Sequence, residues 1–241
     1  TRSGEAYQNS IMALMNAPYF LYHIEVGNGE DANQSDTIRL SSYEVASRLS
    51  YLYLQSMPDA ELMEAAKNFS LLSKPGIQKQ VSRLMKLPLV RKRLTRAFAN
   101  QWLKLDETPQ FRTDIEAVNT MLANLSVAET TANRRSHMIE EVYDYFDYMI
   151  WEKKANFEQL MSSDTVFPRT ADLAEVYGTA VWDGSYASDK IVRAPAGERA
   201  GLLTLAHSLF TGLESTRPII RGAHLYKRFL CGDLPIPGDN N

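Results

Sequence analysis

The amino-acid sequence predicts an all-α protein, a multi-helix bundle whose helices are joined by short connections. Along most of the chain, apolar residues recur three and four positions apart, which is the period of a helix that buries one face. Prolines, glycines and capping side chains separate these stretches, and short connections favour antiparallel neighbouring helices. Strand-like composition occurs in one place, so we expect at most a small β-hairpin near residues 178–195.

The first predicted helix ends at Pro18, because proline cannot continue a helix from its interior. One face of this helix is apolar and consists of Tyr7, Ile11, Leu14 and Met15. Residues 27–37 are glycine-rich and acidic, which predicts a surface loop.

The second helix begins with a capping signal. Ser41 and Glu44 have the spacing of a capping box, in which each side chain bonds the other residue's free backbone N–H group. The apolar stripe behind this signal consists of Val45, Leu49 and Leu52. We therefore expect a helix from Ser41 onward that buries this stripe.

Three more helices are expected before residue 104. Residues 57–59, Met-Pro-Asp, place a proline in a first turn and an acid at the positive end of the helix, both of which are favourable. Residues 73–87 and the stretch that follows Pro88 then repeat apolar residues at helical spacing.

A long helix is predicted from about Ser126 to Glu152, whereas residues 104–125 show no clear pattern. The inner face of the long helix consists of Met138, Val142, Tyr145, Phe146 and Met149. A short helix then ends at Gly178. Residues 179–182 and 190–193 are rich in β-branched side chains and are the two candidate strands of the hairpin.

Two closing helices are predicted over residues 199–210 and 217–230. In the second, the expected buried stripe is Ile219, Ala223, Tyr226 and either Phe229 or Leu230. Its basic residues fall mainly elsewhere, at Arg217, Arg221, His224, Lys227 and Arg228. Gly232 suits the left-handed residue that ends many helices.

The composition excludes several classes of protein. A net charge of −3 over 241 residues argues against a nucleic-acid-binding surface. A single cysteine excludes an internal disulfide framework and any site built from several thiolates. No apolar run approaches the length of a transmembrane segment. The chain starts at Thr1, so we interpret it as a mature or excised piece whose targeting signal, if it had one, is gone.

The most suggestive polar residues lie on the long helix. His137, Glu140, Glu141 and Asp144 recur at intervals that would let their side chains converge on a divalent metal ion, with Asp147 one turn further. The alternative is a solvated acidic face opposite the apolar stripe. Because no second helix supplies further ligands, we expect no metal site. If the chain did bind a metal ion, these residues would be the candidate ligands.

Two histidines and the cysteine are the remaining single-residue candidates. His207 and His224 lie on predicted neighbouring helices and could meet or contact a partner's haem, although such histidines are more often hydrogen-bonded boundary residues. Cys231 would need a nearby base or cation to act as a nucleophile, and the last turn of a helix disfavours an anion. We therefore expect a packed or inert thiol.

No nucleophile elbow, phosphate loop or dinucleotide fingerprint occurs, and the catalytic residues are unknown. Hydrolysis of a polysaccharide would need two acids that face one cleft and have separated pKa values. The candidates are Glu140, Glu141, Asp164, Asp172 and Asp183. Trp182, in a polar loop, is the candidate for stacking on a sugar ring.

The order of the motifs resembles a known arrangement. Residues 1–26, with Ala-Leu-Met-Asn-Ala-Pro-Tyr-Phe-Leu-Tyr, resemble the end of the domain of unknown function 1595. Residues 38–178 resemble the domain of unknown function 1592 through Ser-x-x-Glu, Ala-x-Arg-Leu-Ser-Tyr, Met-Pro-Asp, Gln-Trp-Leu and Leu-Ala-x-x-Tyr-Gly. Residues 196–241, with Gly-Leu-Leu-Thr and Arg-Gly, resemble the domain of unknown function 1588 and are expected to pack as one unit with the 1592-like domain.

The resemblance implies an exported bacterial protein of the planctomycete type, periplasmic or extracellular, whose relatives often carry a c-type cytochrome domain. Because Cys-x-x-Cys-His is absent, this chain cannot attach haem covalently in the ordinary way. Haem c would belong to a missing domain or to a partner. The implied partners are other domains or subunits of the same exported protein, a cytochrome or a polysaccharide.

These observations favour a helical scaffold or interaction module over an enzyme. The alternatives are an extracytoplasmic hydrolase that acts on polysaccharide and an electron-transfer subunit that docks a cytochrome through the helices of His207 and His224.

Overall fold

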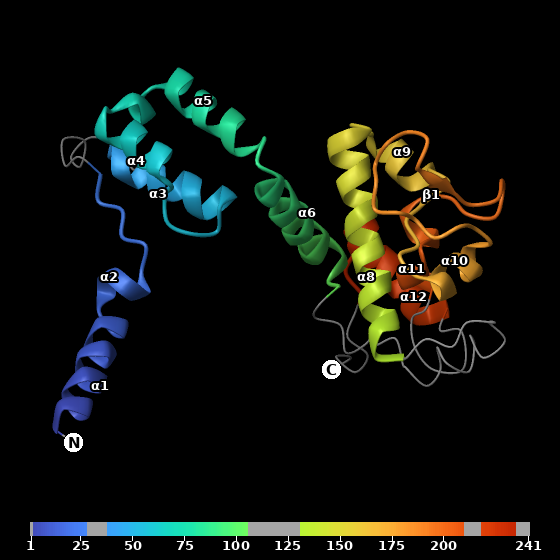
Figure 1. The fold of residues 1–241 in the computed structure, drawn as a ribbon, viewed down its shortest axis with the longest axis horizontal. Helices are drawn as coiled ribbons and strands as arrows, with labels where there is room; N and C mark the ends of the chain where they lie inside the picture. Colours follow the sequence, from blue (N-terminus) through green and yellow to red (C-terminus); the bar gives the residue numbers. More distant parts are fainter. Residues whose placement is uncertain (1, 28–37, 106–130, 210–217, 235–241) are drawn as a thin grey trace, which may run out of the picture. The chain divides into compact units, whose positions relative to one another are not determined.

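The computed structural model describes residues 2–27, 38–105, 131–209 and 218–234 (Figure 1). The protein is mostly helical and has one small two-stranded antiparallel sheet, which confirms the all-α class and the presence of a small β element. It divides into two compact units, Thr1–Val90 and Arg91–Asn241. Among the described helices, none is long and apolar enough to cross a membrane. The division into segments 1–26, 38–178 and 196–241 stays a prediction.

The first unit is built from short helices. They are α1 (Arg2–Met15), α2 (Pro18–Leu21), α3 (Ser42–Tyr53), α4 (Ala60–Lys67), the 3-10 turn η1 (Ser70–Leu72) and α5 (Lys74–Leu84). The next helix, α6 (Pro88–Leu103), begins in this unit and continues into the second. Helix α1 ends before Pro18, as expected, and Pro18 occupies the first position of α2.

The predicted capping box at the start of α3 is confirmed. Ser41 Oγ accepts from the backbone N–H of Glu44 at 3.3 Å, and Glu44 Oε2 accepts from the N–H of Ser41 at 2.7 Å. The other oxygen of Glu44 accepts from the N–H groups of Val26 and Gly27 at 2.7 and 3.1 Å. One carboxylate therefore caps α3 and holds the incoming segment against it.

The core of the first unit lies between α3, α4, η1 and α5. It consists of Ala46, Leu49, Leu62, Ala65, Ala66, Leu71 and Leu84. The expected stripe of Val45, Leu49 and Leu52 was wrong in one member, since Leu52 is 61% exposed. Helix α3 is rotated so that Ser42 and Ala46 face inward, because these small side chains allow close packing against the alanines of α4.

The second unit surrounds one long helix. Its elements after α6 are α8 (Thr131–Asp147), the π-helical turn η2 (Tyr148–Glu152), α9 (Phe157–Ser162), β1 (Thr165–Val166), α10 (Ala171–Tyr177), β2 (Val192–Arg193), η3 (Leu202–Thr204), α11 (Ala206–Leu209) and α12 (Pro218–Phe229). The predicted inner face of α8 is confirmed, because Met138, Val142, Tyr145, Phe146 and Met149 are all at most 2% exposed. The expected start at Ser126 lies outside the described residues.

The small sheet differs from the expected hairpin in one strand. Residues 190–193 contribute β2, as expected, but its partner is β1, with Thr165 opposite Arg193 and Val166 opposite Val192. Residues 179–182 form no strand. The backbone N–H of Trp182 instead donates a hydrogen bond to Pro168 O at 2.8 Å, on the segment after β1. The short helix α10 ends as predicted, at Gly178 in the left-handed conformation with φ +63°.

The two closing helices also differ from expectation. Residues 199–209 form the turn η3 and the short α11 instead of one continuous helix. The predicted inner stripe of α12 was wrong in two members, since Ile219 is 86% exposed and Tyr226 41%. Ala223 and Phe229 are half-buried, as predicted for this helix. Its rotation is set by Trp102, whose indole N–H donates to Arg228 O at 2.7 Å and whose ring lies 5.2 Å from that of Phe229.

The end of α12 shows why glycine stands at position 232. The left-handed residue is Cys231, with φ +51°, and not Gly232 as predicted. A Cβ on Gly232 would lie 2.1 Å from the ring of Tyr226. Gly232 therefore allows a close approach of the backbone to that ring and does not serve as the left-handed cap.

We predict that Glu44→Ala destabilises the first unit by about 1 kcal/mol, the usual cost of a lost helix cap. Hydrogen bonds, led by the backbone N–H of Ser41, lower the pKa of Glu44 from 4.5 to about 2. Because the folded pKa is the lower one, this stabilisation is present above pH 4.5 and is lost as the pH falls toward 2. Urea unfolding at neutral and acidic pH should show a difference between variant and parent that shrinks with acid. Glu64→Ala, at an exposed position of α4, is the control, and an equal difference at both pH values would contradict the assignment.

Candidate functional site

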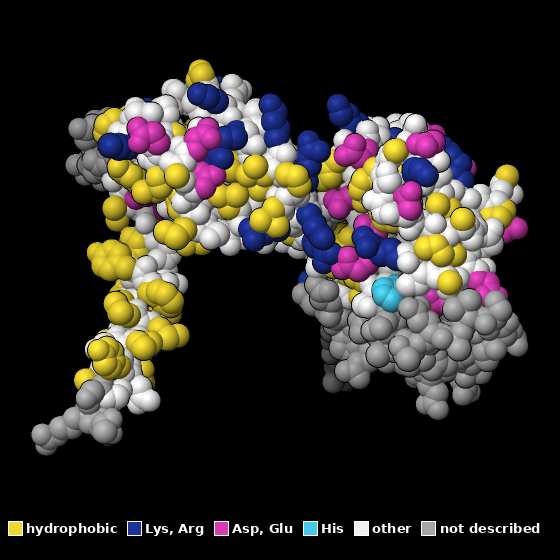
Figure 2. Space-filling model, viewed as in Figure 1, with side chains coloured by type: hydrophobic (Ala, Val, Ile, Leu, Met, Phe, Trp, Pro, Cys, Tyr) yellow, Lys and Arg dark blue, Asp and Glu magenta, His cyan; other side chains and the backbone are white. Residues whose placement is uncertain are grey.

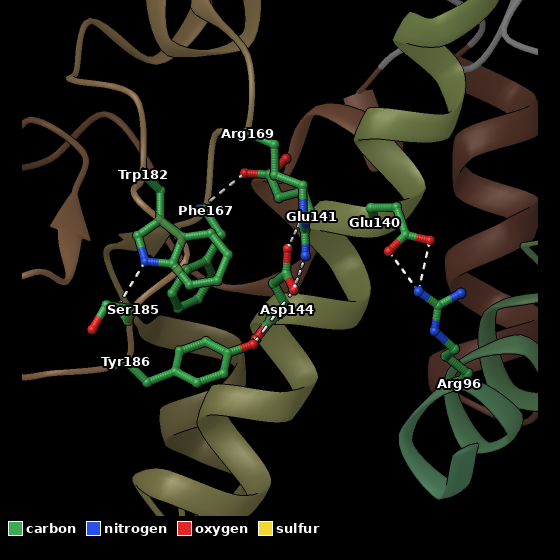
Figure 3. A network of polar contacts seen from close by, with 9 residues as sticks. All are labelled: Arg96, Glu140, Glu141, Asp144, Phe167, Arg169, Trp182, Ser185 and Tyr186. Carbon is green, nitrogen blue, oxygen red and sulfur yellow. Dashed lines mark hydrogen bonds and ion pairs between the residues drawn. The ribbon is translucent and has the colours of Figure 1, made fainter. Parts of the chain in front are cut away.

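The polar residues of α8 form a network of buried and half-buried contacts in the second unit (Figure 3). Glu140, Glu141 and Asp144 lie within two turns of this helix, yet Figure 3 shows their carboxylates turned toward different partners. Each partner lies on another segment of the chain. The chemistry of the site follows from these separate pairs.

Glu141 is fully buried, with an exposure of 0%. Its Oε2 accepts from the hydroxyl of Tyr177 at 2.7 Å, and its Oε1 accepts from the backbone N–H of Phe167 at 3.3 Å. The Tyr177 oxygen in turn accepts from the N–H of Ala206 at 2.6 Å. One carboxyl group therefore connects α8, α10, the segment after β1 and α11.

Burial dominates the ionisation of this group. It raises the pKa of Glu141 from 4.5 to about 8, although the hydrogen bonds from Tyr177 and Phe167 act in the opposite direction. Burial also raises the pKa of Tyr177 well above its usual value, and the neighbouring Glu141 adds to the effect. At neutral pH the pair is thus largely uncharged.

Asp144 forms an ion pair with Arg169. The guanidinium donates from Nε at 2.5 Å and from Nη2 at 2.6 Å to the two carboxylate oxygens. The Asp144 side chain is 7% exposed and the Arg169 side chain 40%. Burial raises the pKa of Asp144, while the bonds from Arg169 oppose that rise. Arg169 also lies 5.6 Å from the ring centre of Trp182, within cation–π distance.

Trp182 does not have the exposed face that stacking on a sugar requires, so that hypothesis was wrong. The residue is 5% exposed. Its indole N–H donates to Ser185 O at 2.8 Å, and its ring packs edge-on against Phe167 with centroids 4.8 Å apart. The loop that appears polar in sequence is folded around this indole.

Glu140 pairs with the basic run of α6. Arg96 Nη2 donates to its two carboxylate oxygens at 2.7 and 2.5 Å, and the guanidinium lies 4.5 Å from the ring centre of Tyr143. The contact fixes the second-unit part of α6 on α8. Arg96, which belongs to the basic run 90–96, therefore binds side chains of α8.

The side chains proposed as metal ligands do not converge on one point. Glu140, Glu141 and Asp144 bind Arg96, Tyr177 and Arg169, while His137 is half-buried one turn earlier. Among the residues that the structure describes, no group of three or more His, Cys, Asp or Glu side chains could hold a metal ion.

The other acids proposed for hydrolysis accept hydrogen bonds from different residues. Asp164 accepts from Arg193 at 2.6 Å on the surface. Asp172 is buried and accepts from the hydroxyl of Thr170 and from the N–H of Leu173. Asp183 is exposed and accepts from the N–H of Ser185 at 2.9 Å. Each of these carboxylates stabilises a local turn or a strand pair.

The structure does bring His207 and His224 together. Both line a cavity of about 300 Å³ formed by α11, α12, the end of α6 and η3. Burial, followed by the charge of Arg228, lowers the pKa of His224 below its usual value. Contact with a partner's haem stays a prediction. Cys231 is exposed and not packed.

Sequence reasoning missed the partners of the acids, namely Tyr177, Arg169 and Arg96. A signal existed for Tyr177, because it belongs to the Leu-Ala-x-x-Tyr-Gly motif noted above. Its separation of 36 residues from Glu141 gave no indication of the pairing.

Together these contacts define a helical module in which the acids of the central helix hold the module's own loops. The family model described as "PSD4: Protein of unknown function (DUF1592)" matches residues 40–179. The chain therefore belongs to this family, and the match includes Glu44, α8 and Tyr177. No curated protein and no solved structure matches the chain.

The titration of Glu141 yields a prediction. The folded protein keeps this proton up to about pH 8, whereas the unfolded chain releases it above about 4.5, so stability falls as the pH rises through this range. Glu141→Gln removes the titration. Relative to the parent, its free energy of unfolding should therefore increase by several kcal/mol, on the order of 5, between the two ends of the range. Urea unfolding across these pH values checks this, with the exposed Glu158→Gln as control. A pH-independent difference would contradict it.

The ion pair of Asp144 yields a second prediction. Arg169→Gln leaves a buried carboxylate without its cation and should cost about 2 kcal/mol, less than a fully buried pair because Arg169 is 40% exposed. Asp144→Asn leaves a guanidinium that water can solvate and should cost clearly less. Thermal unfolding of both variants gives the comparison. Arg193→Gln, in the exposed pair with Asp164, should change stability by about 0.5 kcal/mol or less. The reverse ranking of the two first variants would contradict the interpretation.

Proposed function

We propose that the chain is a non-catalytic helical interaction module of an exported multidomain protein. Its partner is an apolar helical surface on another domain of the same protein. The observation that carries this proposal is the exposed apolar surface of α1 and α2, termed here the N-terminal apolar face.

The N-terminal apolar face is rich in large side chains, which Figure 2 shows along the helix labelled α1 in Figure 1. Their exposures lie between 53% and 87%. They are Tyr7, Ile11, Met12, Leu14, Met15, Tyr19, Phe20, Leu21 and Tyr22. A soluble protein rarely leaves so many large apolar side chains exposed on one segment, and such surfaces mark interaction sites.

The spacing of these residues indicates what covers them. Tyr7, Ile11, Leu14 and Met15 recur at the intervals of one helical stripe, which packs against another helix or into a groove between helices. The described acidic side chain in the first turn is Glu5, and no basic side chain occupies the last turn. An apolar helical partner is therefore favoured over a charged one.

The resemblance of residues 1–26 to the end of a 1595-like domain supports a partner within the same protein. In this proposal the N-terminal apolar face completes the core of that neighbouring domain. The exported location and the association with a cytochrome or polysaccharide-related domain belong to the same proposal. The structural use of Glu140, Glu141 and Asp144 supports a role in assembly, because these acids already hold the fold together.

Binding to separately produced domains of the same open reading frame tests the proposal. Isothermal titration calorimetry of the 241-residue chain should detect one such domain. Ile11→Asp combined with Tyr19→Asp should weaken this binding at least about tenfold, because each carboxylate would have to be desolvated in the interface. Gln8→Asp, at an exposed polar position of α1, is the control and should bind like the parent.

Three results would contradict this function. The first is equal binding by Ile11→Asp/Tyr19→Asp and Gln8→Asp, and the second is no binding by any domain of that reading frame. The third is turnover of a glycan, ester or peptide by the purified chain that point mutants abolish.

A further inference from the structure

The cavity that contains His207 and His224 has the features of a small-molecule site. Its volume of about 300 Å³ lies at the lower end of the range for such sites. Apolar side chains form part of its wall, namely Leu103, Leu203, Pro218 and Leu225. Polar side chains form the remainder, with His207 and Ser208 from α11 and Arg221 and His224 from α12.

The helix backbone itself borders this cavity at Gly222. A Cβ added there would meet no atom within 4 Å, and the φ of Gly222 is not in the left-handed region. Neither a close contact nor the backbone conformation therefore requires glycine at this position. Glycine inside a helix costs up to about 1 kcal/mol relative to alanine. Its presence is explained if the cavity must remain open on this side.

The charge of the lining selects an anion. Arg221 is positively charged at all physiological pH values. Among the described residues that line the cavity, none is acidic. His207 and His224 add two imidazole rings to the same wall. A negatively charged group would thus meet a cation, and among the described lining residues it would meet no carboxylate.

The walls are held in place by contacts outside the cavity. Trp102 precedes Leu103 on α6, and its indole N–H donates to Arg228 O at 2.7 Å. The rings of Trp102 and Phe229 lie 5.2 Å apart, and those of His224 and Phe229 lie 6.4 Å apart. These contacts fix α12 against α6, so the cavity does not have to form when a ligand arrives.

We propose that this cavity binds a small organic carboxylate with an apolar tail. The carboxylate lies beside Arg221 and the imidazoles of His207 and His224, and the tail lies against Leu103, Leu203 and Leu225. This binding function is independent of the N-terminal apolar face and goes beyond the role in assembly proposed above.

Octanoate is the probe, and 1-octanol, which has the same chain without the charge, is the matched control ligand. Binding to the full 241-residue chain is measured by calorimetry and by proton NMR of its four histidines. Octanoate should bind at least about tenfold more tightly than octanol, because the charge-assisted contacts need the carboxylate. It should shift the imidazole signals of His207 and His224 and leave those of His23 and His137 unchanged, which distinguishes the cavity from the N-terminal apolar face.

Variants on α12 locate the site. Gly222→Phe should abolish octanoate binding by filling the cavity, and Arg221→Gln should weaken it about tenfold or more. Lys227→Gln removes an exposed basic residue of the same helix that does not line the cavity, and its affinity should stay within about twofold of the parent. If Gly222→Phe does not fold, the comparison of Arg221→Gln with Lys227→Gln still shows whether octanoate binds in the cavity.

The proposal is overturned if octanoate does not bind, or if octanol binds as tightly. It is also overturned if Arg221→Gln and Lys227→Gln have the same affinity, or if the shifted histidines are not His207 and His224.

Discussion

The buried carboxyl of Glu141 is the constraint on which the second unit depends. It receives hydrogen bonds from Tyr177 and from the backbone of Phe167, and Tyr177 in turn receives one from Ala206. An unpaired buried donor costs about 1–3 kcal/mol, so removal of this one acceptor would leave two donors unsatisfied, the hydroxyl of Tyr177 and the backbone N–H of Phe167. The contacts are directional, and they fix where α10 and α11 lie on α8. Apolar packing against the same helix stabilises these elements, but by itself it would not specify their positions.

This constraint follows from how little regular structure covers α8. Residues 163–201 contain two two-residue strands and one short helix, so many of their backbone groups have no partner of the kind that a helix or sheet supplies. A side chain of α8 provides such a partner instead, because Glu141 accepts from the N–H of Phe167 at 3.3 Å. Another, Tyr145, donates to Leu160 O at 2.6 Å in the last turn of the preceding helix α9. The acids of α8 are therefore occupied in holding loops. This occupation explains why a sequence rich in carboxylates on one helix face folds without gathering them around a common point.

Sequence patterns over a few residues predicted caps, helix ends and buried stripes well. Contacts between side chains far apart in the sequence could not be predicted. The capping box of Ser41 and Glu44, the end of α10 at Gly178 and the buried stripe of α8 all depend on residues that are near neighbours along one helix. The partners of Glu140 and Glu141 lie 44 and 36 residues away, and a single sequence contains no measure of such proximity. The exposure of Trp182 was predicted wrongly for the same reason. Its neighbours in sequence are polar, and they give no indication that the ring of Phe167 packs against it. Candidate site residues were thus identified by type, but their roles were not.

Helix α12 is the place where the local pattern and the fold disagree most. It exposes Ile219, Tyr226 and Leu230, while Arg221, His224 and Arg228 on its other side are half-buried. A helix placed by hydrophobic burial alone would have the opposite rotation. The bond from Trp102 to Arg228 O and the packing of Phe229 on Trp102 maintain the observed one. Natural sequences violate such rules mainly where function requires it. The rotation that exposes these apolar side chains also places a guanidinium, an imidazole and Gly222 on the wall of one cavity, and the proposed carboxylate site depends on this arrangement.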